Sequence, residues 1–417
     1  MNGEQERIDR RGFLKSVGAA GVAPALARFG TAFGASTDAG ESGMAYIAGK
    51  KQKSKLPLRK LGKTNIWVPE LSFGTFGVDF DNQLLLHKAV ENDVTFWDTA
   101  YSYSGGNCEV GIGKFIRRNP EVRKKLFLST KASDTFTIQD VEDRLQTSLK
   151  RMNTNYIDLY HLHTIKGPER LKNDLRDWAK SAKERGLIRY FGFTTHVNMI
   201  PCLKVGVKLD WIDAVMIRYN FREMQRKDIN DMVDECYKAN IGIVAMKVQG
   251  RGQVEKIETA ADKKLTDHFI KSGSTAGQAK IKAVTANKKI STACVGINTV
   301  KNLTENLAAV VDPKKLTAED MRVLREVAQE SCNGYCAGCA QICDSVLAQT
   351  PYVSDVMRYL MYHDSYGDKQ VARQLFAEIP ADVRARLLRV DYSAAEARCP
   401  QRLAIGRLMA EAVGKLA

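Results

Sequence analysis

The sequence contains no uninterrupted run of 18 apolar residues, so it predicts no transmembrane span. It also lacks a long block of Lys or Arg. The 63 Lys and Arg residues outnumber the 48 Asp and Glu residues by 15, but this excess is spread along the chain, as on a solvated basic surface. We therefore expect no nucleic-acid partner. With 417 residues, 44% of them hydrophobic, the chain has room for one large domain and an appendage.

A glycine-rich dinucleotide turn is also absent after the first expected strand, where SFGTFG has the wrong glycine spacing. Eight β-rich runs alternate with stretches of helical period between residues 57 and 310. This alternation predicts an α/β fold, a (β/α)8 TIM barrel, followed by a small all-α C-terminal appendage. An open doubly wound sheet is the less favoured alternative. The expected strands are 71–76, 94–100, 126–132, 156–163, 188–195, 214–220, 241–248 and 291–297.

The first residues have the layout of an export signal. A twin arginine, Arg10 and Arg11, precedes a weakly apolar stretch rich in Ala and Gly and a small-residue cleavage motif. This order predicts a twin-arginine signal peptide over 1–35, although Asp9 stands where Ser or Thr is more usual. Residues 36–55 are then expected to be a linker. The protein is thus expected to be periplasmic or extracellular, with the twin-arginine export machinery as a partner.

Four chemically useful side chains follow three consecutive predicted strands. Asp98, Lys131 and His163 stand at strand ends, and Tyr103 follows Asp98 by five residues. TIM-barrel enzymes carry their active sites at these carboxyl ends. A lysine ammonium group would lower the phenol pKa of Tyr103 from about 10, and a histidine can orient a carbonyl oxygen. The set predicts proton-transfer chemistry, whereas His161 is expected to be a packed core histidine.

The segments FWDTAYSY, LFLSTK and YIDLYHLH resemble the three catalytic segments of the aldo-keto reductase superfamily. LRKLGKTNIWVPELSFGTF, GLIRYFGFTTH, GIVAMK and CVGINTVKNLTENL resemble other parts of its barrel, in the family order. The resemblance covers about residues 57–310 and assigns 56–315 to an aldo-keto reductase-like barrel. It implies an NAD(P)-dependent oxidoreductase that interconverts a carbonyl and an alcohol by hydride transfer. Tyr103 would be the general acid/base, tuned by Asp98 and Lys131, and His163 would orient the substrate.

The resemblance also implies cofactor contacts, with departures from the family pattern. Thr194 and Thr195 stand where Ser and Asn are usual, and Met216 stands where Gln is usual. The usual basic residue for a 2′-phosphate is missing near GINT, so both NADP and NAD remain candidates. The residues expected at the cofactor are Thr194, Thr195, Tyr219, Lys247, Gly250, Arg251, Glu305 and Asn306.

The βα alternation ends near residue 315, and 316–417 predicts short helices around the cysteine-rich stretch SCNGYCAGCAQIC. Its later cysteines and a distant Cys-Pro are arranged like the ligands of a ferredoxin-type [4Fe–4S] cluster. The same plan resembles the cysteine-rich tail of some twin-arginine aldo-keto reductase relatives. Disulfides or free thiols remain open, whereas a zinc site lacks a His at ligand spacing. The candidate cluster ligands are Cys336, Cys339, Cys343 and Cys399.

A cluster in this tail would be structural more readily than electron-carrying. Hydride transfer moves two electrons and a [4Fe–4S] centre takes one, and no flavin signature is present to split the pair. Two other functions remain open beside the reductase. One is an iron–sulfur electron-transfer protein that uses the barrel as a scaffold, and the other is a cofactor-binding regulatory subunit without catalysis.

Overall fold

The computed structural model describes residues 44–47, 50–76, 78, 83–133, 135, 137–250, 260–330, 336–347, 352–364 and 368–417. The expected signal peptide at 1–35 and Arg251 lie outside these residues. Among the described helices, none combines the length and the apolar character needed to cross a membrane.

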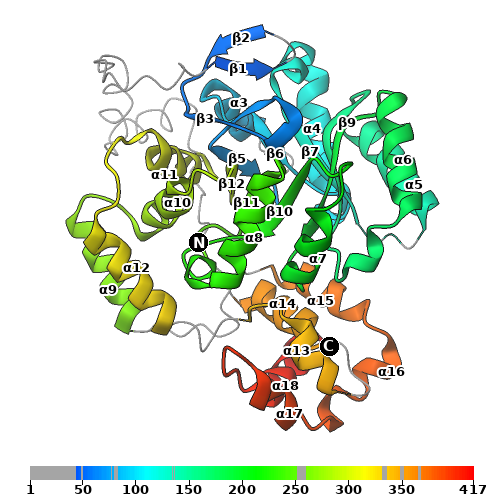
Figure 1. Cartoon of the computed structure of the whole chain (residues 1–417), viewed down its shortest axis with the longest axis vertical. Helices are drawn as coiled ribbons and strands as arrows, with labels where there is room; N and C mark the ends of the chain where they lie inside the picture. The colour runs from blue at the N-terminus through cyan, green and yellow to red at the C-terminus, as the bar shows by residue number, and fades with distance from the viewer. Residues whose placement is uncertain are drawn as a thin grey trace, which may run out of the picture. The chain divides into compact units, whose positions relative to one another are not determined.

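Eight parallel strands close into a barrel, which confirms the predicted fold (Figure 1). Their order around the barrel is β10-β11-β12-β5-β6-β7-β8-β9, so each strand pairs with its sequence neighbours and β12 closes onto β5. The strands are β5 (Leu71–Gly74), β6 (Phe96–Asp98), β7 (Phe127–Ala132), β8 (Ile157–Leu162), β9 (Ile188–Thr195), β10 (Ala214–Arg218), β11 (Gly242–Met246) and β12 (Thr292–Gly296).

Helices connect consecutive strands. Two of them begin with reciprocal capping boxes, Thr137 with Asp140 and Thr275 with Gln278, in which each side chain satisfies a backbone N–H of the other residue. The helices of the barrel are α3 (Gln83–Glu91), α4 (Asn107–Arg118), α5 (Ile138–Arg151), α6 (Asn173–Glu184), α7 (Met199–Gly206), α8 (Lys227–Lys238), α9 (Ala260–Lys271), α10 (Ala276–Ala286) and α11 (Val300–Val311).

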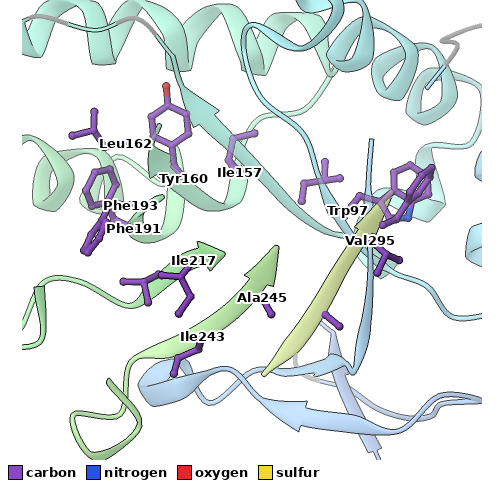
Figure 2. Packing of buried hydrophobic residues seen from close by; sticks show 14 of the residues in the cluster. Trp97, Ile157, Tyr160, Leu162, Phe191, Phe193, Ile217, Ile243, Ala245 and Val295 are labelled. Atoms are coloured by element: carbon purple, nitrogen blue, oxygen red, sulfur yellow. The ribbon is translucent and has the colours of Figure 1, made fainter. Parts of the chain in front are cut away.

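Alternation along the strands divides the apolar side chains into two layers. One layer lies between the strands and the helices, and Figure 2 shows Phe191, Phe193, Ile217 and Ile243 among its members. The other layer belongs to the alternate strand positions, which face the barrel interior, and includes Phe96, Phe127, Leu159, Met216 and Val244. The same alternation turns the catalytic candidates on β6 and β7 toward the interior.

An antiparallel hairpin, β3 (Leu58–Lys60) and β4 (Trp67–Pro69), closes the amino-terminal end of the barrel. Leu61 and Val68 join the interior layer, and the Lys63 amide donates to the Asn240 carbonyl, just before β11. A second hairpin, β1 (Met44–Ile47) and β2 (Lys50–Lys53), falls within the expected linker at 36–55. The last part of that segment is therefore paired β structure.

The C-terminal helices divide into two groups. α12 (Ala318–Glu330) packs through Val323 and Leu324 on Leu265 and Phe269 of α9, so by packing it belongs to the barrel, although the sequence places the boundary at 315. The later helices share a separate apolar cluster, and Figure 1 shows them in orange and red. They are α13 (Ala340–Cys343), α14 (Val353–Asp364), α15 (Lys369–Ala377), α16 (Ala381–Arg384), α17 (Ser393–Arg398) and α18 (Ile405–Leu416).

The segment around Gly338 connects this second group to the barrel. The Arg218 guanidinium, at the end of β10, donates to the Ala337 carbonyl, and the Asn198 amide donates to the Gly338 carbonyl over 3.0 Å. Gly338 has a φ of +64°, and a Cβ atom there would lie 2.5 Å from the His196 carbonyl oxygen. The close approach of the tail to the loop after β9 therefore requires glycine.

Gly338→Ala should destabilise the fold more than an alanine at an unconstrained glycine. Gly273 is the matched control, because it also has a positive φ (+77°) but a Cβ atom there would have nothing within 4 Å. We expect Gly273→Ala to cost about 1 kcal/mol from its φ alone, and Gly338→Ala to cost about 2–4 kcal/mol because of the added clash. Denaturant unfolding measures both. Equal losses would contradict the close approach of Gly338 to the barrel.

Candidate active site

A buried ion pair lies at the carboxyl ends of β6 and β7. The Lys131 ammonium is 2.7 Å from Asp98 Oδ2, and the two side chains are 1% and 4% exposed. Lys131 also donates to the Thr99 carbonyl over 2.6 Å, and Ser129 donates to Asp98 Oδ1 over 3.1 Å. Burial raises the pKa of Asp98, and the adjacent Lys131 charge opposes that rise. The pair fixes the direction in which the ammonium group points.

Tyr103 receives the remaining hydrogen bond of this ammonium group. It opens the short helix η3 (Tyr103–Gly106), and Lys131 Nζ donates to its phenol oxygen over 3.3 Å. Because the oxygen accepts from Lys131, the phenol proton is free to point elsewhere. The pKa of Tyr103 is nevertheless raised well above 10, first by burial and then by the Asp98 charge. The expected lowering of this pKa is thus not found, because burial and the Asp98 charge raise it, and Tyr103 keeps its proton at neutral pH.

His163 lies beside Tyr103, with 5.9 Å between the ring centroids. Burial, followed by the charges of Lys131 and Arg358, lowers its pKa well below 6.5, so the imidazole is neutral at pH 7. Ser102 donates to Ser133, whose oxygen is 2.6 Å from His163 Nδ1. If Ser133 in turn donates to Nδ1, the imidazole proton lies on Nε2. His163 then has a neutral hydrogen-bond donor to offer to a carbonyl oxygen.

These groups line one large cavity of about 1580 Å³. Its volume is larger than the roughly 300–1,000 Å³ typical of a site for one small ligand. Tyr103, His163 and Asp98 line one part of it, together with Met216 on the barrel floor. Its lining further includes Lys247–Gly250, the first turn of α10 and residues of α11.

A family model described as the aldo/keto reductase family matches residues 71–329, more than half of the chain. The chain belongs to the aldo/keto reductase family. Membership makes it an NAD(P)-dependent oxidoreductase.

Two curated relatives illustrate the similarity. Aldo-keto reductase yakc [NADP(+)] of Schizosaccharomyces pombe is 30% identical over 219 residues, which cover 47% of this chain and 62% of that protein. L-galactose dehydrogenase of Arabidopsis thaliana is 23% identical over 66% of this chain and 94% of its own length. The similarity thus extends over nearly the whole of some relatives and over about two thirds of this chain.

Solved structures share the fold. An aldo-keto reductase from Bacillus halodurans in its holo form aligns with a TM-score of 0.55 at 21% identity, over 65% of this chain and 96% of that chain. A thermostable aldo-keto reductase in complex with the inhibitor epalrestat aligns with a TM-score of 0.54 at 25% identity, over 65% and 100% of the two chains.

The cavity of this aldo/keto reductase fits a dinucleotide along one part of its lining. Lys247, Gly250, Glu305 and Asn306, all expected at the cofactor, line it. Gln249 donates to the Asn306 side chain over 3.0 Å and holds that amide in place. The first turn of α10 also lines the cavity, and a helix start suits a phosphate, although the capping box already occupies the amides of Thr275 and Gln278.

Three expected cofactor residues are not among those that line the cavity. The Thr194 hydroxyl accepts from the Thr164 amide, and the Thr195 hydroxyl donates to the Ile165 and Val197 carbonyls. Tyr219 is packed in the layer between strands and helices, where its hydroxyl donates to Asn230 over 3.0 Å. The structure uses these three groups to hold backbone and side chains, and it does not present them to a ligand.

The four cysteines expected to bind a cluster are free thiols in the same part of the tail. Cys336, Cys343 and Cys399 pack against its apolar cluster, and α13 contacts α17, whose end precedes Cys399. Burial raises the pKa of Cys336 to about 12, and metals bind the thiolate. Within the described part of the chain, no group of three or more His, Cys, Asp or Glu side chains is arranged to hold a metal ion. As placed, the thiols do not fit a cluster.

Several cavity residues are missing from the sequence-based prediction. Phe76 packs edge-on against Tyr103, at 5.1 Å between centroids, and His196 follows β9 beside the catalytic end. Their position after a barrel strand was a usable clue. The tail also contributes to the lining, and nothing local predicts this. Its lining residues on α14 are Arg358, Tyr359 and Tyr362.

The imidazole of His163 should stay neutral across the range in which an ordinary histidine titrates. Because its pKa lies well below 6.5, lowering the pH from 7.5 to 6 should leave its NMR signals unshifted. The signal is assigned by its loss in His163→Gln. A titration midpoint at or above 6.5 would contradict the buried, cation-flanked environment.

Proposed function

We propose that this protein interconverts a small-molecule carbonyl compound and its alcohol by hydride transfer, with Tyr103 as the general acid/base. The observation that carries the proposal is the hydrogen bond from Lys131 to the Tyr103 oxygen, in the cavity that His163 also lines. The bound nicotinamide cofactor would supply or accept the hydride.

The protein's own side chains have separate tasks in this reaction. In reduction, His163 holds the carbonyl oxygen through Nε2–H, and Tyr103 donates its proton to that oxygen as negative charge develops. Lys131, held by Asp98, faces the phenolate that remains and stabilises it. In oxidation the same groups act in reverse, with Tyr103 as the base.

For the cofactor we favour NADP(H) over NAD(H). A relative from Schizosaccharomyces pombe has NADP(+) in its name, and Lys280 adds a positive charge to the cavity lining near the start of α10. An additional phosphate on the ribose is attracted by such a charge. Met216 offers no amide at the nicotinamide end, so the proposal expects orientation there to depend on shape and backbone groups.

Tyr103→Phe should lower kcat for aldehyde reduction by about 10²–10⁴-fold, because the phenol proton is lost while the ring and its packing stay. NADPH binding, measured by quenching of protein fluorescence, should be unchanged within about threefold. Tyr237→Phe is the matched control, since that phenol is 54% exposed on α8. It should retain the wild-type rate, and a Tyr103→Phe enzyme that also does so would overturn the assignment.

We further propose that the protein is exported through its twin arginine to the periplasm or beyond. The route carries folded proteins, which suits a barrel that must take up its cofactor inside the cell. The alternative function, an iron–sulfur electron carrier, gains no support from the thiols as placed. A [4Fe–4S] cluster therefore stays a prediction from cysteine spacing, and no step of the reaction is assigned to it.

Cell fractionation with iron analysis tests both proposals together. The full chain should reach the periplasm of a bacterial host, and Arg10→Lys/Arg11→Lys should remain in the cytoplasm, with Arg7→Lys as the control that still leaves. Equal export of the double variant would contradict the signal.

Iron analysis of the purified protein tests the cluster. A [4Fe–4S] cluster would give about four iron atoms per chain and a brown protein, whereas iron-free, colourless protein with full activity would exclude it.

A further inference from the structure

Helix α14 forms a wall of the catalytic end of the cavity. The Tyr362 ring is 5.8 Å from Phe76, whose ring in turn packs on Tyr103, and Lys247 Nζ lies 4.9 Å from the Tyr362 centroid. Arg358 precedes Tyr362 by four residues, so both side chains lie on one face of the helix, about 6 Å apart along its axis. Arg358 thus lines the cavity within a short distance of the reacting groups.

Positive charge exceeds negative charge at this wall. Asp355 is 2% exposed and is shared by two cations, with Oδ1 3.0 Å from Arg358 Nη2 and Oδ2 2.6 Å from Lys166 Nζ. One carboxylate cannot neutralise both cations, and Lys247 lies against the same wall, over the Tyr362 ring. Burial lowers the pKa of the nearby His196, and the charges of Lys247 and Arg358 lower it further.

The acidic side chains in the cavity lining have other partners or positions. Asp98 pairs with Lys131, and Glu305 on α11 lies 3.9 Å from Lys301. Asp368 caps the start of α15, where its carboxylate accepts from the Val371 amide. The Glu169 carboxylate lies against Gly167 in the loop after β8. Glu378 follows the end of α15.

Asp355 does not satisfy every N–H donor of the Arg358 guanidinium. Its Nε is buried and has no hydrogen-bond partner among the described residues, while one Nη is held by Asp355. A guanidinium offers its N–H groups in a planar fork that matches the two oxygens of a carboxylate. A carboxylate from a ligand in the cavity would pair with the guanidinium and offset the positive charge that Asp355 leaves unbalanced.

We infer that Arg358 recognises the carboxylate of the substrate, so that the preferred substrates are small carbonyl compounds with a carboxylate a few bonds from the carbonyl carbon. This inference rests on the proposed carbonyl chemistry. The tail thereby sets substrate choice, while the barrel supplies the hydride-transfer groups. If Arg358 only anchored α14 through Asp355, its loss would affect all substrates alike.

The test compares succinic semialdehyde with its uncharged analogue pentanal, using NADPH. The wild-type kcat/KM should favour succinic semialdehyde at least tenfold. Arg358→Met should raise KM for succinic semialdehyde 10- to 100-fold with kcat within about threefold, and leave pentanal unchanged. Arg358→Lys should recover part of the preference. Lys166 still pairs with Asp355 in both variants, so the buried carboxylate keeps a positive partner and the fold should be retained.

Arg386→Met is the matched control, because Arg386 pairs with Asp382 on the exposed side of the tail. It should leave both substrates unaffected. Equal kcat/KM values in the wild type, or equal losses for both aldehydes in Arg358→Met, would overturn the inference while leaving the reductase intact. Reduction of neither aldehyde would count against the proposed function. Calorimetry with succinate gives an independent readout: wild type should bind, and binding should be lost in Arg358→Met.

Discussion

The buried ion pair between Asp98 and Lys131 is the interaction on which the site depends. Two charges inside a barrel are costly to desolvate, and removing one partner of such a pair typically costs about 3–5 kcal/mol. The barrel meets that cost with further hydrogen bonds from Ser129 and to the Thr99 carbonyl. These bonds fix the position of the ammonium group, which also donates to the Tyr103 oxygen. The ion pair thus determines where a positive charge lies next to the Tyr103 phenol.

The pair also explains how one site can hold a proton and release it. Burial keeps Tyr103 protonated at rest, so the donor is loaded at neutral pH. The Lys131 charge becomes most valuable when the phenolate forms, because an ion pair in a site of low dielectric is far stronger than in water. Burial is also the main reason that His163 stays neutral, and nearby cations further disfavour a positive charge on its imidazole. The pKa of Tyr103 is thus raised and the pKa of His163 is lowered, so both side chains are uncharged at neutral pH.

Much of this could be predicted from sequence because it is local. Strand length, alternation and the position of Asp98 and Lys131 at strand ends follow from period two and from the closed barrel. Alternation also shows why Thr194 and Thr195, as neighbours on β9, face opposite sides of the sheet, and neither is among the residues that line the cavity. The pKa of Tyr103 could not be predicted, because it depends on how completely the site is enclosed.

The tail is the part that sequence reasoning placed least well. Its helices were expected as a cysteine-bearing appendage, and their lengths follow from apolar periodicity. Their contact with the active site depends on long-range bonds between Arg218, Asn198 and the segment at Gly338, and none of these has a local signature. The catalytic wall therefore combines a barrel common to the family with a helix that lies outside the matched range of 71–329.

The most direct measurement is the transfer of label from NADPH deuterated at both C4 positions to an aldehyde in a single turnover. The account predicts one deuterium on the carbonyl carbon of the product alcohol, as detected by mass spectrometry. It also predicts a slower rate in deuterated solvent, because the Tyr103 proton moves in the same reaction. Unlabelled alcohol, or NADPH that is never consumed, would contradict hydride transfer at this site.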